Sequence, residues 1–257
     1  MHWIDAHCHL DLIFDQVGDQ AFETSFRQWQ LAGVRQFVVP AVGGESWRTI
    51  SKLAARFPGI HGCLGVHPCF LREDYSQALS IFDALPGMSG IVAVGEIGLH
   101  AGLGNDAVQR EIFVRQVEIA AYWKLPIVVH SYRCHDEIFS LLKKKRFSCG
   151  GLLHGFSGSY KQAMNFVSIQ FCLGVGGVLT WPRASKTRDT LSRVPLEALM
   201  IETDSPDMPL PGMAKGQNTP LSIPMIFDAL AAARPESPAH IAEKLLLNTA
   251  KVFKFAV

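Results

Sequence analysis

The sequence predicts an α/β protein, a single-domain (β/α)₈ TIM barrel over residues 1–257, and three observations support that fold. Eight short apolar runs rich in β-branched residues alternate with helical patterns, which is typical of a parallel sheet covered by helices. The length of 257 residues suits one such barrel, and no shift in composition marks a linker. Metal-competent side chains also follow five different runs. An open doubly wound sheet would instead gather its ligands around one switch point.

The expected elements cover the whole chain in alternation. Strands are expected near residues 2–6, 34–39, 60–66, 90–95, 125–129, 149–153, 169–175 and 198–203. Helices are expected at about 19–32, 46–56, 75–84, 135–145, 159–167, 185–193, 222–233 and 238–253. The clearest helix follows Asn105, a candidate cap, because Ile112, Phe113 and Val117 recur at helical spacing. The proline-rich segment 205–224 is expected to be a long loop after the last strand.

Composition limits the class of protein. With 48% hydrophobic and 18% charged residues, the chain is not a disordered one. A net charge of +1 gives no general attraction to a polyanion, so any contact with nucleic acid must be local. The six cysteines form no CxxC pair, which favours reduced thiols and a cytoplasmic protein. No apolar run reaches the roughly 18 residues of a membrane span, and no obligate protein partner is evident.

The most informative pattern is an ordered series of side chains that can bind metal ions. They are His7, His9, Glu96, His130, His154 and Asp204. Ligands that follow successive parallel strands point into the mouth of a barrel, where barrel enzymes have their active sites. Taken singly, each has a structural explanation: a paired core carboxylate at 96, satisfied core histidines at 130 and 154, a turn cap at 204. A shared metal site explains all of them together.

The number and type of these ligands indicate a binuclear centre. Four imidazoles and two carboxylates suit zinc, manganese, iron or cobalt better than calcium or magnesium. Six ligands exceed what one tetrahedral zinc ion uses, so we expect two divalent ions about 3.5–4 Å apart, bridged by Glu96. One ion is assigned to His7, His9, Glu96 and Asp204, and the other to Glu96, His130 and His154. Asp204 is the expected general base for an activated water, so Asp204 and Glu96 are the expected catalytic residues.

With this order of ligands in place, the chain resembles the TatD-type metal-dependent deoxyribonucleases of the amidohydrolase-like barrel superfamily, and is similar in particular to their YjjV group. The matching stretches are IDAHCHLD at 4–11, GVHP at 65–68, VGEIGL at 94–99, LPIVVHSYR at 125–133, HGFSGS at 154–159 and IETDSP at 201–206, with the N and P of QNTP at 217–220. They cover the chain in family order.

The resemblance implies a barrel with a divalent-metal phosphodiesterase centre that often trims DNA from its 3′ end. The family's metal ligands fall on the six residues named above, and its extra active-site histidine falls on His67. His67 is either a phosphate-facing group or a turn residue. The chain departs from the family at two places: GLDY becomes Gly98-Leu99-His100-Ala101, and N-E-P becomes Asn218-Thr219-Pro220. Both changes alter the pocket rim rather than the ligands, so they bear on the substrate.

Basic and aromatic residues near the mouth could hold a polyanion. The expected substrate-binding residues are His67, Arg133, Arg183 and Lys186, with Lys215 in the long loop. Tyr132, Phe156 and Trp181 could stack a base, although loop packing is the better reading of Phe156. Ser159 could cap a helix, or the amides there could accept a phosphate oxygen. The run Lys143–Arg146 is expected at the opposite end of the barrel, at a helix C-terminus.

Three functions remain open at this point. The first is a two-metal phosphodiesterase acting on DNA 3′ ends or small phosphoesters. The second is a hydrolase of a small metabolite (amide, lactone or phosphoester), because the same centre polarises carbonyl and phosphoryl groups alike. The third is a non-catalytic, metal-stabilised protein, which is disfavoured because Asp204 and Glu96 are both present.

Overall fold

The computed structural model describes residues 2–71 and 90–256, in which eight parallel strands follow one another around a single sheet. The strands are β1 (Trp3–Asp5), β2 (Val34–Pro40), β3 (Ile60–Leu64), β4 (Ile91–His100), β5 (Ile127–Tyr132), β6 (Gly151–Leu153), β7 (Phe171–Val175) and β8 (Leu199–Ile201). Backbone hydrogen bonds from Ala6 to Ile201 and from Asp204 to His7 join the last strand to the first. The predicted (β/α)₈ barrel is therefore confirmed.

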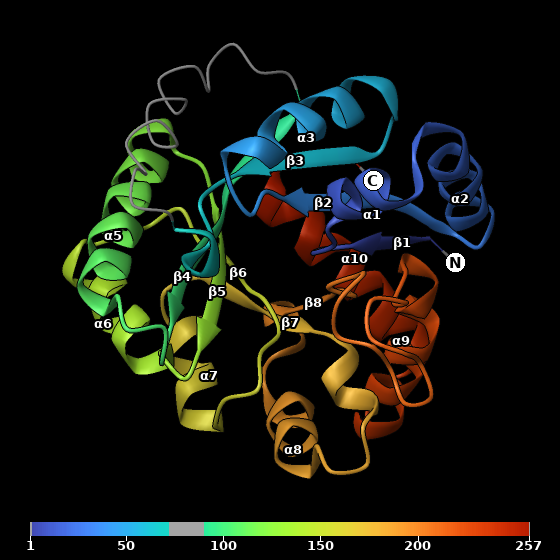
Figure 1. Cartoon of the computed structure of the whole chain (residues 1–257). Coiled ribbons are helices and arrows are strands. Elements are labelled where there is room, and N and C mark those ends of the chain that lie inside the picture. Colours follow the sequence, from blue (N-terminus) through green and yellow to red (C-terminus); the bar gives the residue numbers. More distant parts are fainter. Residues whose placement is uncertain (1, 72–89, 257) are drawn as a thin grey trace.

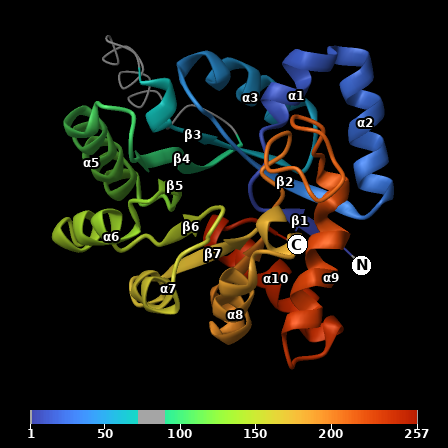
Figure 2. The ribbon, with the colours of Figure 1, turned by 60° about the horizontal axis from the view of Figure 1, so that its bottom comes forward.

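Helices surround the sheet on its outer side (Figures 1 and 2). They are α1 (Leu10–Val17), α2 (Asp19–Leu31), α3 (Gly44–Arg56), α5 (Asp106–Trp123), α6 (His135–Lys144), α7 (Tyr160–Val167), α8 (Ser185–Arg193), α9 (Ile223–Ala233) and α10 (Pro238–Phe253). A continuous apolar cluster, in which Phe22, Phe37, Trp47, Phe113 and Phe166 are buried, fills the layer between sheet and helices. Its burial is the main driving force for this layer.

The inside of the barrel contains a second apolar cluster, which we call the floor. It takes one side chain from each strand or the residue after it, and the aromatic ring at the end of α10 joins them. Its buried members are Ala6, Val38, Cys63, Ala93, Val128, Leu152, Cys172, Met200 and Phe253. The barrel is thus a packed core below its mouth, as its inward side chains require.

Several sequence expectations need correction. The strand expected to stop at residue 95 continues through Glu96 to His100, and the one expected to stop at 129 continues through His130 to Tyr132. Helix α1 was not expected, because the segment was read only as the extended His-x-His motif. Asn105 precedes α5, but its side chain accepts a hydrogen bond from Gln109 and does not cap the helix. The expected helix 75–84 lies outside the described residues.

The described part of the chain has no helix that is both long and apolar enough to span a membrane.

Candidate metal centre

The period of a β-strand places the expected ligands directly above the floor. Inward-facing Val128 and Leu152 belong to the floor, and the side chains two residues further along are His130 and His154. Alternate residues of a strand share a face, so these imidazoles also point inward, one layer nearer the mouth. Met200 and Glu202 are related in the same way on the chain leaving β8. A polar layer therefore lies on an apolar one.

Glu96 lies between two groups of side chains and turns one carboxylate oxygen toward each. Its Oε2 lies 3.4 Å from His7 Nε2 and 3.3 Å from His9 Nε2. Asp204 completes this first group, since its Oδ1 lies 3.1 Å from His7 Nε2 and 3.5 Å from His9 Nε2. The two imidazole nitrogens are 3.3 Å apart. Four donor atoms thus surround one small space.

The second group faces the other oxygen of Glu96. Oε1 lies 2.8 Å from His154 Nε2 and 3.2 Å from His130 Nδ1, and these two nitrogens are 3.2 Å apart. The same oxygen lies 3.2 Å from His67 Nε2. All six predicted ligands therefore meet around one carboxylate. In the described residues, combinations of His7, His9 and Asp204 and of His67, Glu96 and His130 are compact enough to hold an ion.

His67 differs from the other histidines in the way its ring is used. It precedes the short 3₁₀ helix η1 (Pro68–Phe70), and its Nδ1 accepts a hydrogen bond from the Cys69 backbone N–H at 3.1 Å. A neutral ring whose Nδ1 accepts must carry its proton on Nε2, the atom that faces Glu96. His67 is therefore a turn residue and at the same time presents a proton donor to the centre. The turn reading therefore applies, and the contact of His67 with a phosphate stays a prediction.

The electrostatics of the centre fit a cation. Burial alone would lower the pKa of His7, but the nearby Glu96 and Asp204 carboxylates raise it to about 10. Burial would raise the pKa of Asp204, but hydrogen bonds from His7 and His9 hold it well below its usual range. Burial and the charge of His7 lower the pKa of His154 to about 4. Without metal, protons on His7 and His9 balance the carboxylates, and divalent ions would replace them.

Asp204 is held in place by its own backbone and by the long loop that follows. Its φ of 56° is left-handed, a region that Asp tolerates better than most residues. Its backbone N–H donates to His7 O at 2.8 Å. Asn218 fastens the loop, since its Nδ2 donates to Thr203 O at 2.9 Å and to Asp207 O at 2.8 Å. The side chain of Asp204 keeps 14% exposure, whereas Glu96 keeps 2%. Asp204 is thus the more accessible carboxylate.

The two departures from the family pattern have different surroundings. His100 is the last residue of β4, and its Nδ1 lies 3.0 Å from His130 Nε2 and 3.5 Å from Cys69 Sγ. Its ring also stacks on Tyr132 at 4.4 Å. Thr219 instead caps the 3₁₀ helix η5 (Pro220–Ser222) by accepting from Leu221 N–H. His100 therefore touches the centre, while Thr219 shapes the loop.

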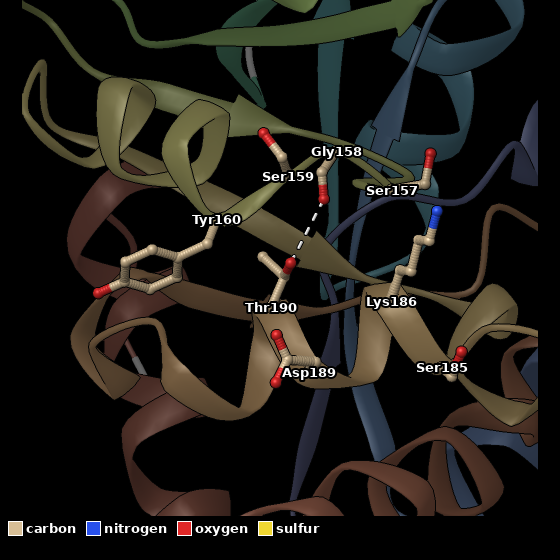
Figure 3. A pocket seen from close by; sticks show the side chains of 8 residues that line it. All are labelled: Ser157, Gly158, Ser159, Tyr160, Ser185, Lys186, Asp189 and Thr190. Atoms are coloured by element: carbon tan, nitrogen blue, oxygen red, sulfur yellow. Dashed lines mark hydrogen bonds between the residues drawn. The ribbon is translucent and has the colours of Figure 1, made fainter.

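The cations expected at the mouth end are exposed, two on loops and one at the start of a helix. Arg133 follows β5 and lies over the Tyr132 ring at 5.3 Å, and Arg183 follows β7 and lies over the Trp181 ring at 5.1 Å. Lys186, in the first turn of α8, lines a hollow of about 570 Å³ and extends toward Ser157 (Figure 3). Ser159 caps α7 through a reciprocal pair of hydrogen bonds with Gln162. These side chains flank the mouth.

The aromatic residues and the basic run that the sequence singled out have different surroundings. Phe156 is fully buried against His135, so it packs the loop and cannot stack a base. Trp181 donates from Nε1 to Pro209 O, whereas Tyr132 is 44% exposed. The Lys143–Arg146 run is at the C-terminal end of α6, where Lys145 pairs with Glu118 at 2.6 Å. The run is thus at the opposite end of the barrel from the centre.

One buried acid of the centre was missed by reasoning from the sequence. Glu202 is fully buried, and its Oε1 accepts from the Gly155 backbone N–H at 2.5 Å. Burial raises the pKa of Glu202 to about 8. The signal was available, because Glu202 follows Met200 and precedes Asp204 by two residues each.

Comparison with known proteins agrees with this fold and with a hydrolase that depends on metal ions. A family model described as TatD related DNase matches residues 4–254. The chain is 38% identical to the uncharacterized metal-dependent hydrolase YjjV of Escherichia coli, covering 98% of this chain and 97% of that protein. The crystal structure of YjjV superimposes with a TM-score of 0.92 at 36% identity, over 99% of this chain and 98% of the other. The 3'-5' ssDNA/RNA exonuclease TatD of Salmonella typhimurium is 29% identical over 87% of this chain and 89% of its own length.

The barrel and the cluster of histidines and acids at its mouth define a metal-dependent hydrolase. The chain belongs to the TatD family and is similar to YjjV over nearly its whole length.

Proposed function

We propose that the chain is a binuclear phosphodiesterase that removes nucleotides from the 3′ end of single-stranded DNA. The observation that carries this proposal is the position of Glu96, whose two oxygens face two separate sets of donors at 2.8–3.4 Å. Such a carboxylate is suited to bridge two ions. A relative at 29% identity is named as a 3'-5' exonuclease of single-stranded DNA and RNA, which supports the substrate class.

The ligands are divided between two divalent ions, of zinc, manganese or a similar metal. His7, His9, Glu96 and Asp204 would hold one ion, and Glu96, His130 and His154 would hold the other. Bound ions would supply Lewis-acid catalysis and lower the pKa of a water molecule. Asp204 takes the proton of the attacking water as general base, because it is the more exposed carboxylate.

The remaining residues bind and orient the substrate. His67 donates from Nε2 to a phosphoryl oxygen, since its Nδ1 is already an acceptor for Cys69 N–H. Arg133, Arg183 and Lys186 bind phosphates of the strand at the mouth, and the exposed Tyr132 ring stacks a base. These contacts hold the scissile bond against the centre.

A second candidate function is hydrolysis of a small ester or lactone. The specific observation is His100, which replaces the family's acid and stacks on Tyr132 beside the centre. Together they make an uncharged aromatic wall that suits a compact substrate. The net charge of +1 also lacks the general attraction for polyanions that many nucleases use.

One substrate comparison tests the proposal. Metal-stripped protein is reloaded with zinc or manganese and incubated with single-stranded DNA labelled at either end, with a chromogenic phosphodiester and with a lactone. We expect progressive shortening from the 3′ end that requires metal. Asp204→Asn prepared in parallel serves to detect contaminating nuclease. Turnover of the lactone without shortening of DNA would favour the second function and contradict the first.

A further inference from the structure

Three buried polar atoms beneath the centre have no hydrogen-bond partner among the described residues. They are His7 Nδ1, His154 Nδ1 and Glu202 Oε2. A buried polar atom without a partner costs about 1–3 kcal/mol, so three together call for an explanation. The same three residues are also grouped in space, since one ring nitrogen of each histidine and one oxygen of Glu202 lie within 4.8 Å of one another.

The backbone around Glu202 is built to receive its carboxylate. On the neighbouring strand β7, a Cβ at position 174 would lie 2.4 Å from Glu202 Oε2, so only glycine leaves this space open. The Gly155 N–H binds Oε1. One oxygen is thus fixed by the backbone and the other is free. The carboxylate is held in a defined place with one acceptor unused.

The two histidine rings present matching donors. The imidazoles of His7 and His154 stack with centroids 4.0 Å apart and planes at 7°. Their Nε2 atoms face the carboxylates of the metal centre. An Nε2 that binds a cation carries no proton, so each Nδ1 must carry one and needs an acceptor. In the described structure, Glu202 Oε2 is the unpartnered acceptor in this group.

We propose that Glu202 is a positioning residue. Its carboxylate accepts hydrogen bonds from the Nδ1–H groups of His7 and His154, directly or through one water molecule. This inference rests on the proposed function, because it assigns those histidines to metal. His7 belongs to one ion's ligands and His154 to the other's, so a single carboxylate orients a ligand of each ion. Glu202 thereby couples the two halves of the centre.

The substitution Glu202→Gln tests this role with little change of shape. If the amide oxygen keeps the Gly155 N–H, the amide nitrogen faces the rings and donates to Nδ1. That contact favours the tautomer with its proton on Nε2, which cannot bind metal. We expect the affinity for both zinc ions, measured by competition with a chelator, to fall about 10–100-fold. Imidazole NMR of the zinc-loaded protein should show both Nδ1–H resonances displaced from their wild-type positions.

Metal-free melting separates this effect from misfolding. Glu202→Gln replaces a fully buried carboxyl group with a neutral amide of nearly the same shape, so metal-free protein should melt no lower than wild type. Asp5→Asn is the matched control, since Asp5 is equally buried but accepts hydrogen bonds from the Thr203 hydroxyl and N–H and from the His7 backbone N–H, rather than from a ligand ring. It should lower the melting temperature and keep zinc affinity within a few-fold of wild type.

The outcomes distinguish this inference from the proposed function. Unchanged zinc affinity and unchanged Nδ1–H resonances in Glu202→Gln would overturn the role of Glu202. An equal loss of affinity in Asp5→Asn would also overturn it, because the effect would then follow from any buried acid. Wild-type protein that binds two zinc ions but cleaves no phosphodiester would contradict the proposed function and leave the Glu202 comparison valid.

Discussion

The floor and the mouth of the barrel are made by the same strands, yet they differ completely in chemistry. At the floor, Val128 and Leu152 are buried among apolar side chains. Two residues further along, His130 and His154 face the Glu96 carboxylate. One step of the β-period therefore separates packing from ligation. The difference teaches that position along a strand, rather than strand identity, decides whether a residue of this barrel stabilises the fold or serves the site.

The largest expected effect comes from removing the residue that joins the two groups of ligands. In Glu96→Ala, both zinc ions should be lost together with activity. The affinity for zinc should fall by more than the roughly 100-fold that loss of an outer-shell partner costs. Elemental analysis and turnover of the purified variant measure this. Retention of two ions per chain at full activity would rule out a bridging Glu96.

Asp204→Asn should separate catalysis from binding. The amide keeps a coordinating oxygen but cannot take a proton, so turnover should fall about 10²–10⁴-fold while most metal is retained. Metal content and kcat are measured on the same preparation. Wild-type turnover in the fully metallated variant would exclude the general-base role.

Leu152→Ala changes the floor two residues below a ligand. Loss of a fully buried leucine side chain should destabilise the fold by about 2–5 kcal/mol, measured by denaturant unfolding. Zinc affinity should change little, because His154 remains anchored on the strand above. A fall in zinc affinity as large as that in a ligand variant would show that floor and mouth are not separable.

The basic residues at the two ends of the barrel should contribute differently to DNA binding. Neutralising Arg133, Arg183 and Lys186 should weaken binding to single-stranded DNA and reduce the salt slope by about 2, since three phosphate contacts are lost. Neutralising Lys143, Lys144 and Lys145 should leave the slope nearly unchanged. Equal small effects from both sets would favour the small-ester function.

The smallest effect concerns His61 near the bottom of the barrel, which stacks on Phe255 at 4.0 Å. Burial lowers the pKa of His61, so the unfolded chain binds a proton more readily than the folded one. Stability from this group is present above the unfolded pKa of about 6.5 and is lost as pH falls below it. In metal-free protein, His61→Gln should reduce the fall in melting temperature over that window; an unchanged pH slope would contradict this.

The fold and the meeting of the six candidate ligands could be predicted from the sequence for a physical reason. Alternating apolar runs specify a parallel sheet, and the order of His and acidic residues relative to those runs specifies the mouth. What the runs could not specify is where a strand ends, because Glu96 and His130 are polar residues inside strands. The two-residue spacing to Asp204 places Glu202 on the inner face, but its hydrogen bond to Gly155 N–H depends on a contact between segments distant in sequence. The contact of His100 with His130 depends on a distant strand in the same way, and no local pattern encodes either.

The central claim, that Glu96 is the shared ligand of two ions, is tested most directly by anomalous diffraction from crystals of the zinc-loaded protein. The account predicts two peaks about 3.5–4 Å apart, one beside each oxygen of Glu96, with Asp204 at one and His130 at the other. A single peak, or two peaks of which only one contacts Glu96, would contradict it.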